Sequence, residues 1–197
     1  RPDERERQPN RWPGTHVEQI STDGGREEVP AHVAALQGDN VTAASIEGYM
    51  TNYYRQAPFK DHHIDLFRSW FDGIERGNGA AVVHCAAGKD RTGIICALTH
   101  LALGVSVDDV FADYDLTNVA VDIEKHLPMA RDHFNEILGK KHDADVYRPF
   151  MGVRRTYLEN AFEVMTDAHG SPLGYARDVL GLTNERADNL KRRFILS

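Results

Sequence analysis

The feature that most constrains the fold is a short apolar run that leads through a glycine-containing loop into an apolar helix. Residues 80–84 are Ala-Ala-Val-Val-His, the pattern of a short buried strand, and residues 85–93 are Cys-Ala-Ala-Gly-Lys-Asp-Arg-Thr-Gly. A helix is expected to follow from about Thr92 to Leu103. A strand, a tight loop and a helix N-terminus in succession gather free backbone N–H groups at the positive end of a helix dipole. This segment therefore predicts a binding site for an anion.

The loop also carries groups that are needed for nucleophilic attack on a phosphate monoester. Such an attack requires a thiolate, donors to the phosphate oxygens and a proton source. Cys85 precedes a helix N-terminus and lies six residues before Arg91, an arrangement that lowers the pKa of a thiol. The Arg91 guanidinium has the fork that binds two phosphate oxygens at once. Thr92 places a hydroxyl where it can hydrogen-bond the thiolate, and His84 is expected to orient the loop from beneath.

The backbone between the cysteine and the arginine is expected to surround the phosphate, with a glycine at position 88 to permit a sharp turn. A nucleotide-binding P-loop does not fit this spacing. No glycine stands five residues before Gly88, and no serine or threonine directly follows Lys89. The expected phosphate-binding residues are Ala86, Ala87, Gly88, Lys89, Asp90 and Arg91.

The rest of the chain predicts an α/β fold in which a central sheet is flanked by helices and the C-terminal half is mostly helical. A further short strand is expected at 15–20, and helices are expected over 42–55 and along 64–74, the second amphipathic and closed by Gly77. Beyond Gly104 the pattern is nearly all helical, and Thr42, Ser106 and Thr183 are expected to cap the starts of helices. We expect one domain over residues 1–197. Because the chain opens on a charged run without an initiator Met, we also expect the full-length protein to have an N-terminal segment that this sequence lacks.

Composition limits the partners of such a site. The formal net charge of −7 argues against broad nucleic-acid binding, so an anionic substrate needs a local positive pocket. Two cysteines are too few for a disulfide framework and fit a reducing compartment. The longest nearly apolar run, 94–105, is too short to span a bilayer, and no secretory signal opens the chain. We expect a cytoplasmic protein without stable membrane insertion, leaving open secretion without a visible signal peptide.

The loop residues His84, Cys85, Arg91 and Thr92 match the His-Cys-x5-Arg-Thr/Ser signature, and the chain thereby resembles the cysteine-dependent protein tyrosine phosphatase superfamily. The fuller string, His-Cys-x-x-Gly-Lys-Asp-Arg-Thr-Gly, is similar to the bacterial atypical dual-specificity branch that includes mycobacterial tyrosine phosphatase B. Further similarity lies in 112–114 with Asn118, in 157–158, in 170–171 and at Tyr175. The front end departs from the family, since its Asn-Phe-Arg-Asp-like motif and its first core strand are not found here.

The resemblance implies a hydrolase that removes phosphate from protein phosphotyrosine through a covalent phosphocysteine on Cys85, with no metal and no organic cofactor. Phosphoserine or phosphothreonine activity is a further expectation of this branch. Lys89 and Asp90 resemble loop residues of phosphoinositide phosphatases, so a phosphoinositide substrate is an alternative. A second alternative is a phosphate-recognition module without turnover, although such proteins usually lose the cysteine or the arginine, and this chain keeps both.

Two residues are candidates for the general acid that protonates the leaving oxygen. Asp23 lies in a predicted loop after the first expected strand, where many superfamily members carry a mobile acid. Asp90 lies inside the loop next to Arg91, where a carboxylate can also brace the backbone by accepting hydrogen bonds. We prefer Asp23, because its loop has reach and mobility, and keep Asp90 as the alternative.

Overall fold

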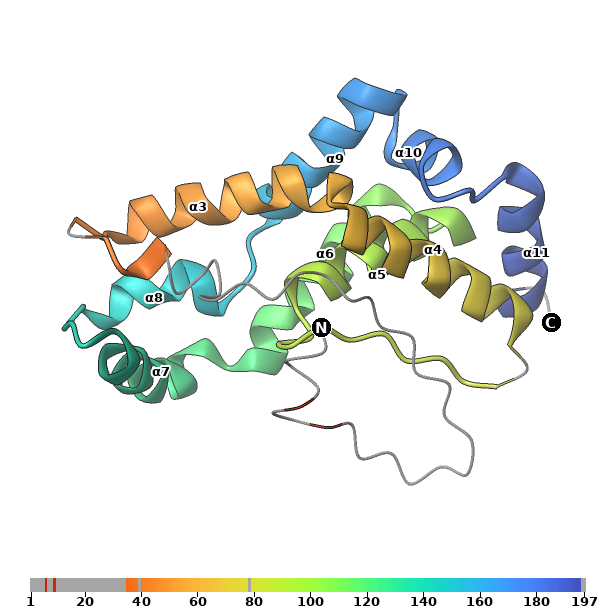
Figure 1. Ribbon diagram of the computed structural model, residues 1–197. Coiled ribbons are helices and arrows are strands. Elements are labelled where there is room, and N and C mark those ends of the chain that lie inside the picture. Colours follow the sequence, from red (N-terminus) through yellow and green to blue (C-terminus); the bar gives the residue numbers. More distant parts are fainter. Residues whose placement is uncertain (1–5, 7–8, 10–34, 39, 78, 196–197) are drawn as a thin grey trace.

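The computed structural model describes residues 6, 9, 35–38, 40–77 and 79–195, and these residues form a helical assembly (Figure 1). The N-terminal half of this part contains α3 (Ala43–Gln56), the short 3-10 helix η1 (Ala57–Phe59), α4 (Asp61–Arg76) and α5 (Asp90–Leu103). The C-terminal half contains α6 (Val107–Val121), α7 (Ile123–Leu138), α8 (Ala144–Met151), α9 (Arg155–His169), α10 (Pro172–Asp178) and α11 (Asn184–Phe194).

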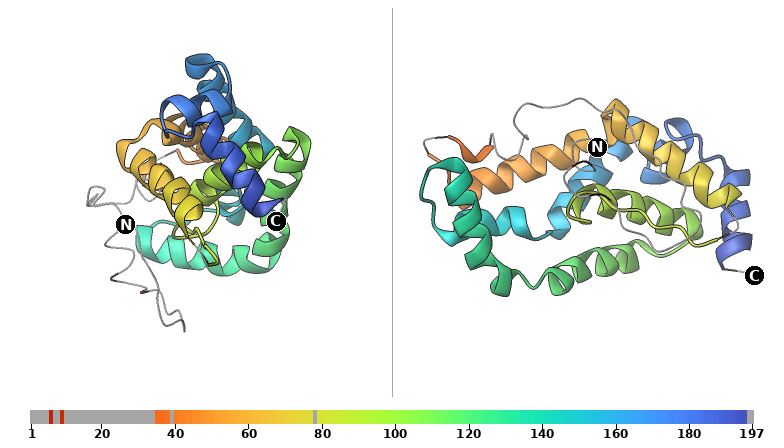
Figure 2. Two further views of the ribbon diagram at one scale, coloured as in Figure 1. Left: turned by 90° about the vertical axis from the view of Figure 1, so that its right-hand side faces the viewer. Right: turned by 60° about the horizontal axis from the view of Figure 1, so that its bottom comes forward.

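Helix α5 lies at the centre of this arrangement. It packs against α6, α9, α10 and α11, while α7 and α8 lie at one end of the assembly and α11 at the other (Figures 1 and 2). The buried side chains of α5 come from several of its faces, as expected of a helix enclosed by others. They are Ile94, Ile95, Ala97, Leu98 and Ala102. No helix in the described part of the chain combines the length and the apolar character needed to cross a membrane.

Short polar side chains start several helices, as the sequence predicts. The Thr42 hydroxyl accepts a hydrogen bond from the Ser45 backbone N–H at 3.1 Å, and the Ser45 hydroxyl accepts one from the Thr42 N–H at 2.9 Å. This reciprocal pair is a capping box, and it satisfies N–H groups that the first turn of a helix leaves unpaired. The Ser106 and Thr183 hydroxyls cap α6 and α11 by accepting from the backbone N–H groups of Asp109 and Arg186. These three helix starts confirm the corresponding predictions.

The amphipathic helix predicted along 64–74 is also confirmed. It spans Asp61–Arg76, buries Phe67, Phe71 and Ile74, and ends at Gly77, whose N–H donates to the Gly73 carbonyl at 2.9 Å. The apolar stripe at steps of three and four thus faces the core.

The predicted central sheet is wrong for the part of the chain that the structure describes, because no described residue belongs to a strand. Residues 80–84 were expected to form a buried strand and instead form an irregular connection in which the Val82 side chain is 64% exposed. A short apolar run becomes a strand only when a neighbouring strand pairs with its backbone groups, and no described segment does so here. The other expected strand, 15–20, lies outside the described residues.

Candidate active site

The loop that follows residue 84 places Cys85 just before the N-terminus of the central helix, α5. Gly88 has a φ of +65°, a left-handed conformation that a side chain would strain, and this allows the chain to turn sharply. Helix α5 begins at Asp90, and its first hydrogen bond runs from the Gly93 N–H to the Lys89 carbonyl at 2.7 Å. The helix therefore starts two residues earlier than predicted, so that Asp90 and Arg91 both lie in its first turn.

The half-buried Cys85 thiol is the nucleophile candidate, and its surroundings favour the thiolate. Burial raises the pKa of Cys85, but the nearby Thr92 hydroxyl, the Arg91 guanidinium and the backbone N–H groups of Thr92 and Lys89 outweigh burial and bring the pKa below its usual range. The buried Thr92 hydroxyl acts on the thiol from close by, yet completes no hydrogen bond with any described residue. It is therefore available to donate to the thiolate.

The side chain of Lys89 turns away from the loop into the protein. It is 4% exposed, and its ammonium donates to the Phe150 carbonyl at 2.5 Å and to the Gly152 carbonyl at 3.0 Å. An Asp90 carboxylate oxygen lies 3.4 Å from the same ammonium. Lys89 thus offers the loop its backbone N–H, while its charge lies where α8 ends and the connection to α9 begins.

Asp90 is fixed from a second side by two tyrosines. The Tyr54 hydroxyl donates to one Asp90 oxygen at 2.9 Å, and the Tyr54 and Tyr114 hydroxyls lie 2.6 Å apart. A phenol has one proton, which Tyr54 gives to Asp90, so Tyr114 is the donor in the tyrosine pair. Burial raises the pKa of Tyr54 well above its usual range, and the Asp90 charge adds to this effect, so the phenol stays protonated and able to donate. We call Tyr114, Tyr54 and Asp90 the tyrosine brace.

The glycine at position 93 makes room for the tyrosine brace. A Cβ atom added at Gly93 would lie 2.7 Å from the nearest ring carbon of Tyr114, closer than real Cβ contacts occur. The Tyr114 ring therefore packs directly on the backbone of the first turn of α5. The last glycine of the loop string is explained by this packing rather than by a turn.

Two aromatic side chains whose pKa values are shifted by burial are Tyr53 of α3 and His63 of α4. Burial raises the pKa of Tyr53, and the charges of Arg91, Asp90 and Cys85 also act on its phenol. The Lys60 ammonium lies 5.5 Å from the centre of the Tyr53 ring.

The centre of the His63 ring lies 6.4 Å from the centre of the Tyr53 ring. Burial lowers the pKa of His63 to about 3, although the Ala57 carbonyl, 2.8 Å from its Nδ1 atom, acts in the opposite direction. The ring is therefore neutral at physiological pH.

The remaining loop residues face solvent. His84, Ala86, Ala87 and Gly88 are exposed, and the His84 Nδ1 atom lies 3.1 Å from the Cys85 carbonyl oxygen. The role predicted for His84, to orient the loop from beneath, stays a prediction. Asp23, the preferred general acid, lies outside the described residues.

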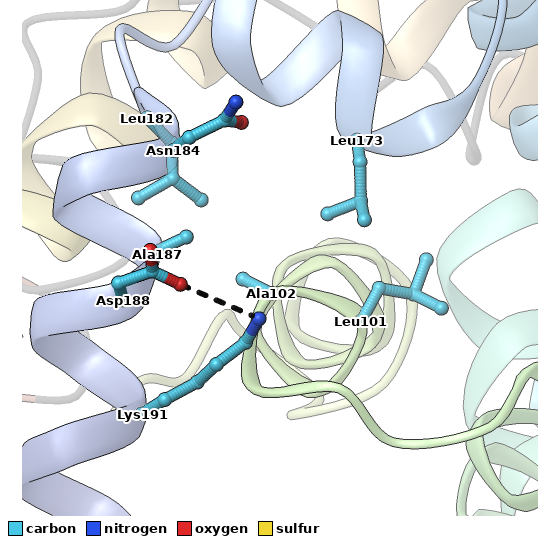
Figure 3. A pocket seen from close by; sticks show the side chains of 8 residues that line it. All are labelled: Leu101, Ala102, Leu173, Leu182, Asn184, Ala187, Asp188 and Lys191. Carbon is cyan, nitrogen blue, oxygen red and sulfur yellow. Dashed lines mark ion pairs between the residues drawn. The ribbon is translucent and has the colours of Figure 1, made fainter.

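Two hollows lie along α5. A small one of about 90 Å³ lies behind the loop and is lined by Thr92, Cys96, Asp113 and Tyr114 among others. A larger one of about 340 Å³ lies at the opposite end of α5, where Leu101 and Ala102 face Leu173 of α10 and residues of α11 (Figure 3). Figure 3 shows an apolar floor with Lys191 and Asp188 paired at one side and no nucleophile among the lining residues. The chemistry therefore belongs to the loop and not to the larger hollow.

Both cysteines are free thiols. Within the described ranges, no three or more His, Cys, Asp or Glu side chains are grouped so that they could hold a metal ion. The groups gathered around the loop are a thiol, a guanidinium, a hydroxyl and backbone N–H donors. Together they suit nucleophilic attack on an electrophilic centre whose anionic oxygens are held by the donors.

Comparison with known proteins decides the family. A model of the tyrosine phosphatase family matches residues 1–196. The chain belongs to this family. The triple specificity protein phosphatase PtpB of Mycobacterium tuberculosis is 30% identical over 142 residues, which cover 66% of this chain and 49% of PtpB. A protein of Cupriavidus necator provisionally named a tyrosine-protein phosphatase is also 30% identical over 142 residues, covering 71% of this chain and 48% of that protein. The chain thus spans about half the length of the curated relatives it matches.

Membership of the tyrosine phosphatase family confirms the resemblance stated for the loop. Sequence reasoning did not predict the tyrosine brace or the position of the Lys89 side chain. The brace joins residues 36 and 60 positions apart, and the Lys89 contacts span 61 and 63 positions. No local pattern reports such contacts. The one available signal was the similarity at 112–114, which includes Tyr114.

Proposed function

We propose that this member of the tyrosine phosphatase family hydrolyses phosphate monoesters, with protein phosphotyrosine as its main substrate, through a covalent phosphocysteine on Cys85. The observation that carries the proposal is the Cys85 thiol at the N-terminus of α5, where Thr92, Arg91 and backbone N–H groups lower its pKa against the effect of burial. A thiolate at neutral pH is the nucleophile that this reaction needs.

In the first step the Cys85 thiolate attacks phosphorus, a sulfur–phosphorus bond forms, and the bond from phosphorus to the leaving oxygen breaks. The leaving oxygen takes a proton from the general acid. Arg91 and the backbone N–H groups of residues 86–91 hold the three equatorial oxygens while charge builds on them. In the second step water attacks phosphorus and gives a proton to the conjugate base of the general acid, while the sulfur–phosphorus bond breaks and phosphate is released. The Thr92 hydroxyl then stabilises the departing thiolate by donating a hydrogen bond.

We propose Asp23 as the general acid and retain Asp90 as the alternative. The contacts of Asp90 support this preference, because one of its oxygens accepts from Tyr54 and the other faces the Lys89 ammonium. A leaving oxygen would have to displace one of these partners to reach the Asp90 carboxyl group.

The substrate range of the proposed enzyme extends to other phosphomonoesters. One relative is named a triple specificity protein phosphatase, and this supports activity beyond phosphotyrosine. The exposed backbone of residues 86–88 also leaves the loop open to leaving groups of different size. We propose a single phosphatase domain over residues 1–197 that needs neither a metal nor an organic cofactor.

Turnover of a chromogenic aryl phosphate, with and without vanadate, tests the proposal. Cys85→Ser should abolish turnover while phosphate binding persists, because the loop and Arg91 remain and the serine hydroxyl ionises poorly. Cys96→Ser, which changes the other thiol of the chain, is the matched control and should keep its activity. Substantial turnover by Cys85→Ser would rule out the phosphocysteine, and absence of turnover in the folded wild type would favour a phosphate-recognition module.

A further inference from the structure

The buried ammonium of Lys89 calls for an explanation, because lysine is almost never buried without a partner. The residues just before it, 86–88, are exposed, whereas Lys89 itself is 4% exposed. The chain therefore turns inward at this residue. Whatever binds above the loop does not meet the Lys89 side chain from the solvent side.

The ammonium is held by groups of the protein. An ammonium has three N–H donors. Two donate to the carbonyls of Phe150 and Gly152, at 2.5 Å and 3.0 Å, and an Asp90 oxygen lies 3.4 Å away. The ammonium also lies 5.3 Å from the centre of the Phe150 ring. Two carbonyls that accept hydrogen bonds and one carboxylate at ion-pair distance thus surround the ammonium.

The segment that receives these hydrogen bonds is itself fixed. The Asn118 side chain of α6 donates to the Val153 carbonyl at 3.0 Å and accepts from the Val153 N–H at 2.8 Å. A Cβ atom added at Gly152 would lie 2.5 Å from Ile123 Cδ1 and 2.8 Å from Asn118 Oδ1. The connection between α8 and α9 is therefore packed tightly against α6 and α7, and it provides a firm attachment point.

The other end of the same residue faces the nucleophile. The backbone N–H of Lys89 is one of the donors that favour the Cys85 thiolate, and the Lys89 carbonyl accepts the first hydrogen bond of α5. Tethering the side chain therefore also sets the position of a thiolate donor and the start of the helix that carries Arg91. A displacement of catalytic groups by about 1 Å costs on the order of 10²-fold in rate.

We propose that Lys89 is a positioning residue of the phosphatase reaction, whose side chain ties the catalytic loop to the α8–α9 connection instead of contacting substrate. This inference rests on the proposed function of the loop. It opposes the alternative in which the Lys89 ammonium binds a second phosphate of an inositol headgroup. A headgroup-binding lysine would affect inositol substrates selectively, whereas a positioning lysine affects every substrate alike and changes the ionisation of Cys85 as well.

The decisive variant is Lys89→Met, which keeps the length of the side chain and removes the donors. We expect kcat to fall by about 10- to 100-fold on both a phosphotyrosine peptide and a short-chain phosphatidylinositol phosphate, with KM little changed. The pH midpoint for alkylation of Cys85 by iodoacetamide, followed by mass spectrometry of its peptide, should rise. The control is Lys191→Met, which changes a lysine of α11 beside the C-terminal end of α5 and should alter none of these values. Selective loss of the inositol substrate, or an unchanged alkylation midpoint, would overturn the proposal.

A second variant separates positioning from the loss of a nearby positive charge. Gly152→Ala leaves Lys89 intact but adds a methyl group that would lie 2.5 Å from Ile123 Cδ1 and 2.8 Å from Asn118 Oδ1. Because Asn118 also holds the neighbouring Val153, we expect the carbonyls that hold Lys89 to shift. If Lys89 acts by positioning the loop, Gly152→Ala should also lower kcat on both substrates and raise the pH midpoint for alkylation of Cys85. Wild-type kinetics in a folded Gly152→Ala protein would contradict the proposal, and this variant decides the matter if circular dichroism shows that Lys89→Met does not fold. Alkylation needs no turnover, so it tests the tether even if the phosphatase proposal fails.

Discussion

The tyrosine brace gives a quantitative prediction for the change Tyr54→Phe, which removes a single oxygen from the interior. The lost Tyr54 hydroxyl donates to the Asp90 carboxylate at 2.9 Å and accepts from Tyr114 at 2.6 Å. A hydrogen bond to a charged group contributes about 1.5–3 kcal/mol, and a buried hydroxyl left without a partner costs about 1–3 kcal/mol. Allowing for partial relaxation around Tyr114, we expect the free energy of unfolding to fall by about 2–4 kcal/mol.

Thermal and urea denaturation measure this loss. For a chain of this size, about 2–4 kcal/mol corresponds to a Tm decrease of about 4–16 °C. The matched control is Tyr147→Phe, whose hydroxyl donates at 2.8 Å to the neutral Asn135 side chain. Asn135 keeps a second donor, the His142 backbone N–H. Tyr147→Phe should therefore cost only about 0.5–1.5 kcal/mol.

A double-mutant cycle with Asp90→Asn isolates the contact between Tyr54 and the carboxylate. If the hydrogen bond operates as described, the two changes are not additive, and their interaction energy is about 1–2 kcal/mol. Additivity within about 0.5 kcal/mol would refute the reasoning, because it would mean that Tyr54 stabilises the protein without using Asp90.

Three further predictions concern the same region. Gly93→Ala should displace the Tyr114 ring and lower both stability and activity, whereas wild-type melting would show that the ring has room to move. His63, with a folded pKa of about 3 against about 6.5 unfolded, should make stability fall as pH drops from about 6.5 toward 3, by up to about 1.4 kcal/mol per pH unit. Urea titrations across this range should show a shallower slope for His63→Phe, and equal slopes would contradict the assignment. Changing the general acid to Asn should cost about 10²–10⁴ in rate, mainly on poor leaving groups. We expect that pattern for Asp23→Asn, and finding it only for Asp90→Asn would reverse our preference.

Local sequence signals were enough to predict three helix N-caps and the turn of the loop. Thr42, Ser106 and Thr183 satisfy N–H groups within three residues of themselves, so their role is visible in a few neighbouring letters. Gly88 likewise adopts the positive φ that its place in a tight loop implies. The position of Cys85 before α5 follows from the same short stretch of chain.

The expected sheet failed because a strand is defined by its partner and not by its own composition. Residues 80–84 have the apolar pattern of a strand, but in the described part of the chain nothing pairs with them, and Val82 is largely exposed. Helix α5 was easier to predict, because its hydrogen bonds close within the element and its apolar side chains are buried from several sides.

The loop residues divide according to what constrains them, which a sequence pattern alone does not reveal. Three of them fit contacts with other parts of the protein. Lys89 donates to the end of α8, and Asp90 accepts from Tyr54 of α3. Gly93 makes room for Tyr114 of α6. The side chains of Ala86 and Ala87 are exposed and meet no such demand. Changes at the first three positions must therefore disturb packing and chemistry together. Under the proposed function, changes at positions 86 and 87 should affect mainly the bound substrate, so substrate range can be varied there while the helix that carries Arg91 stays in place.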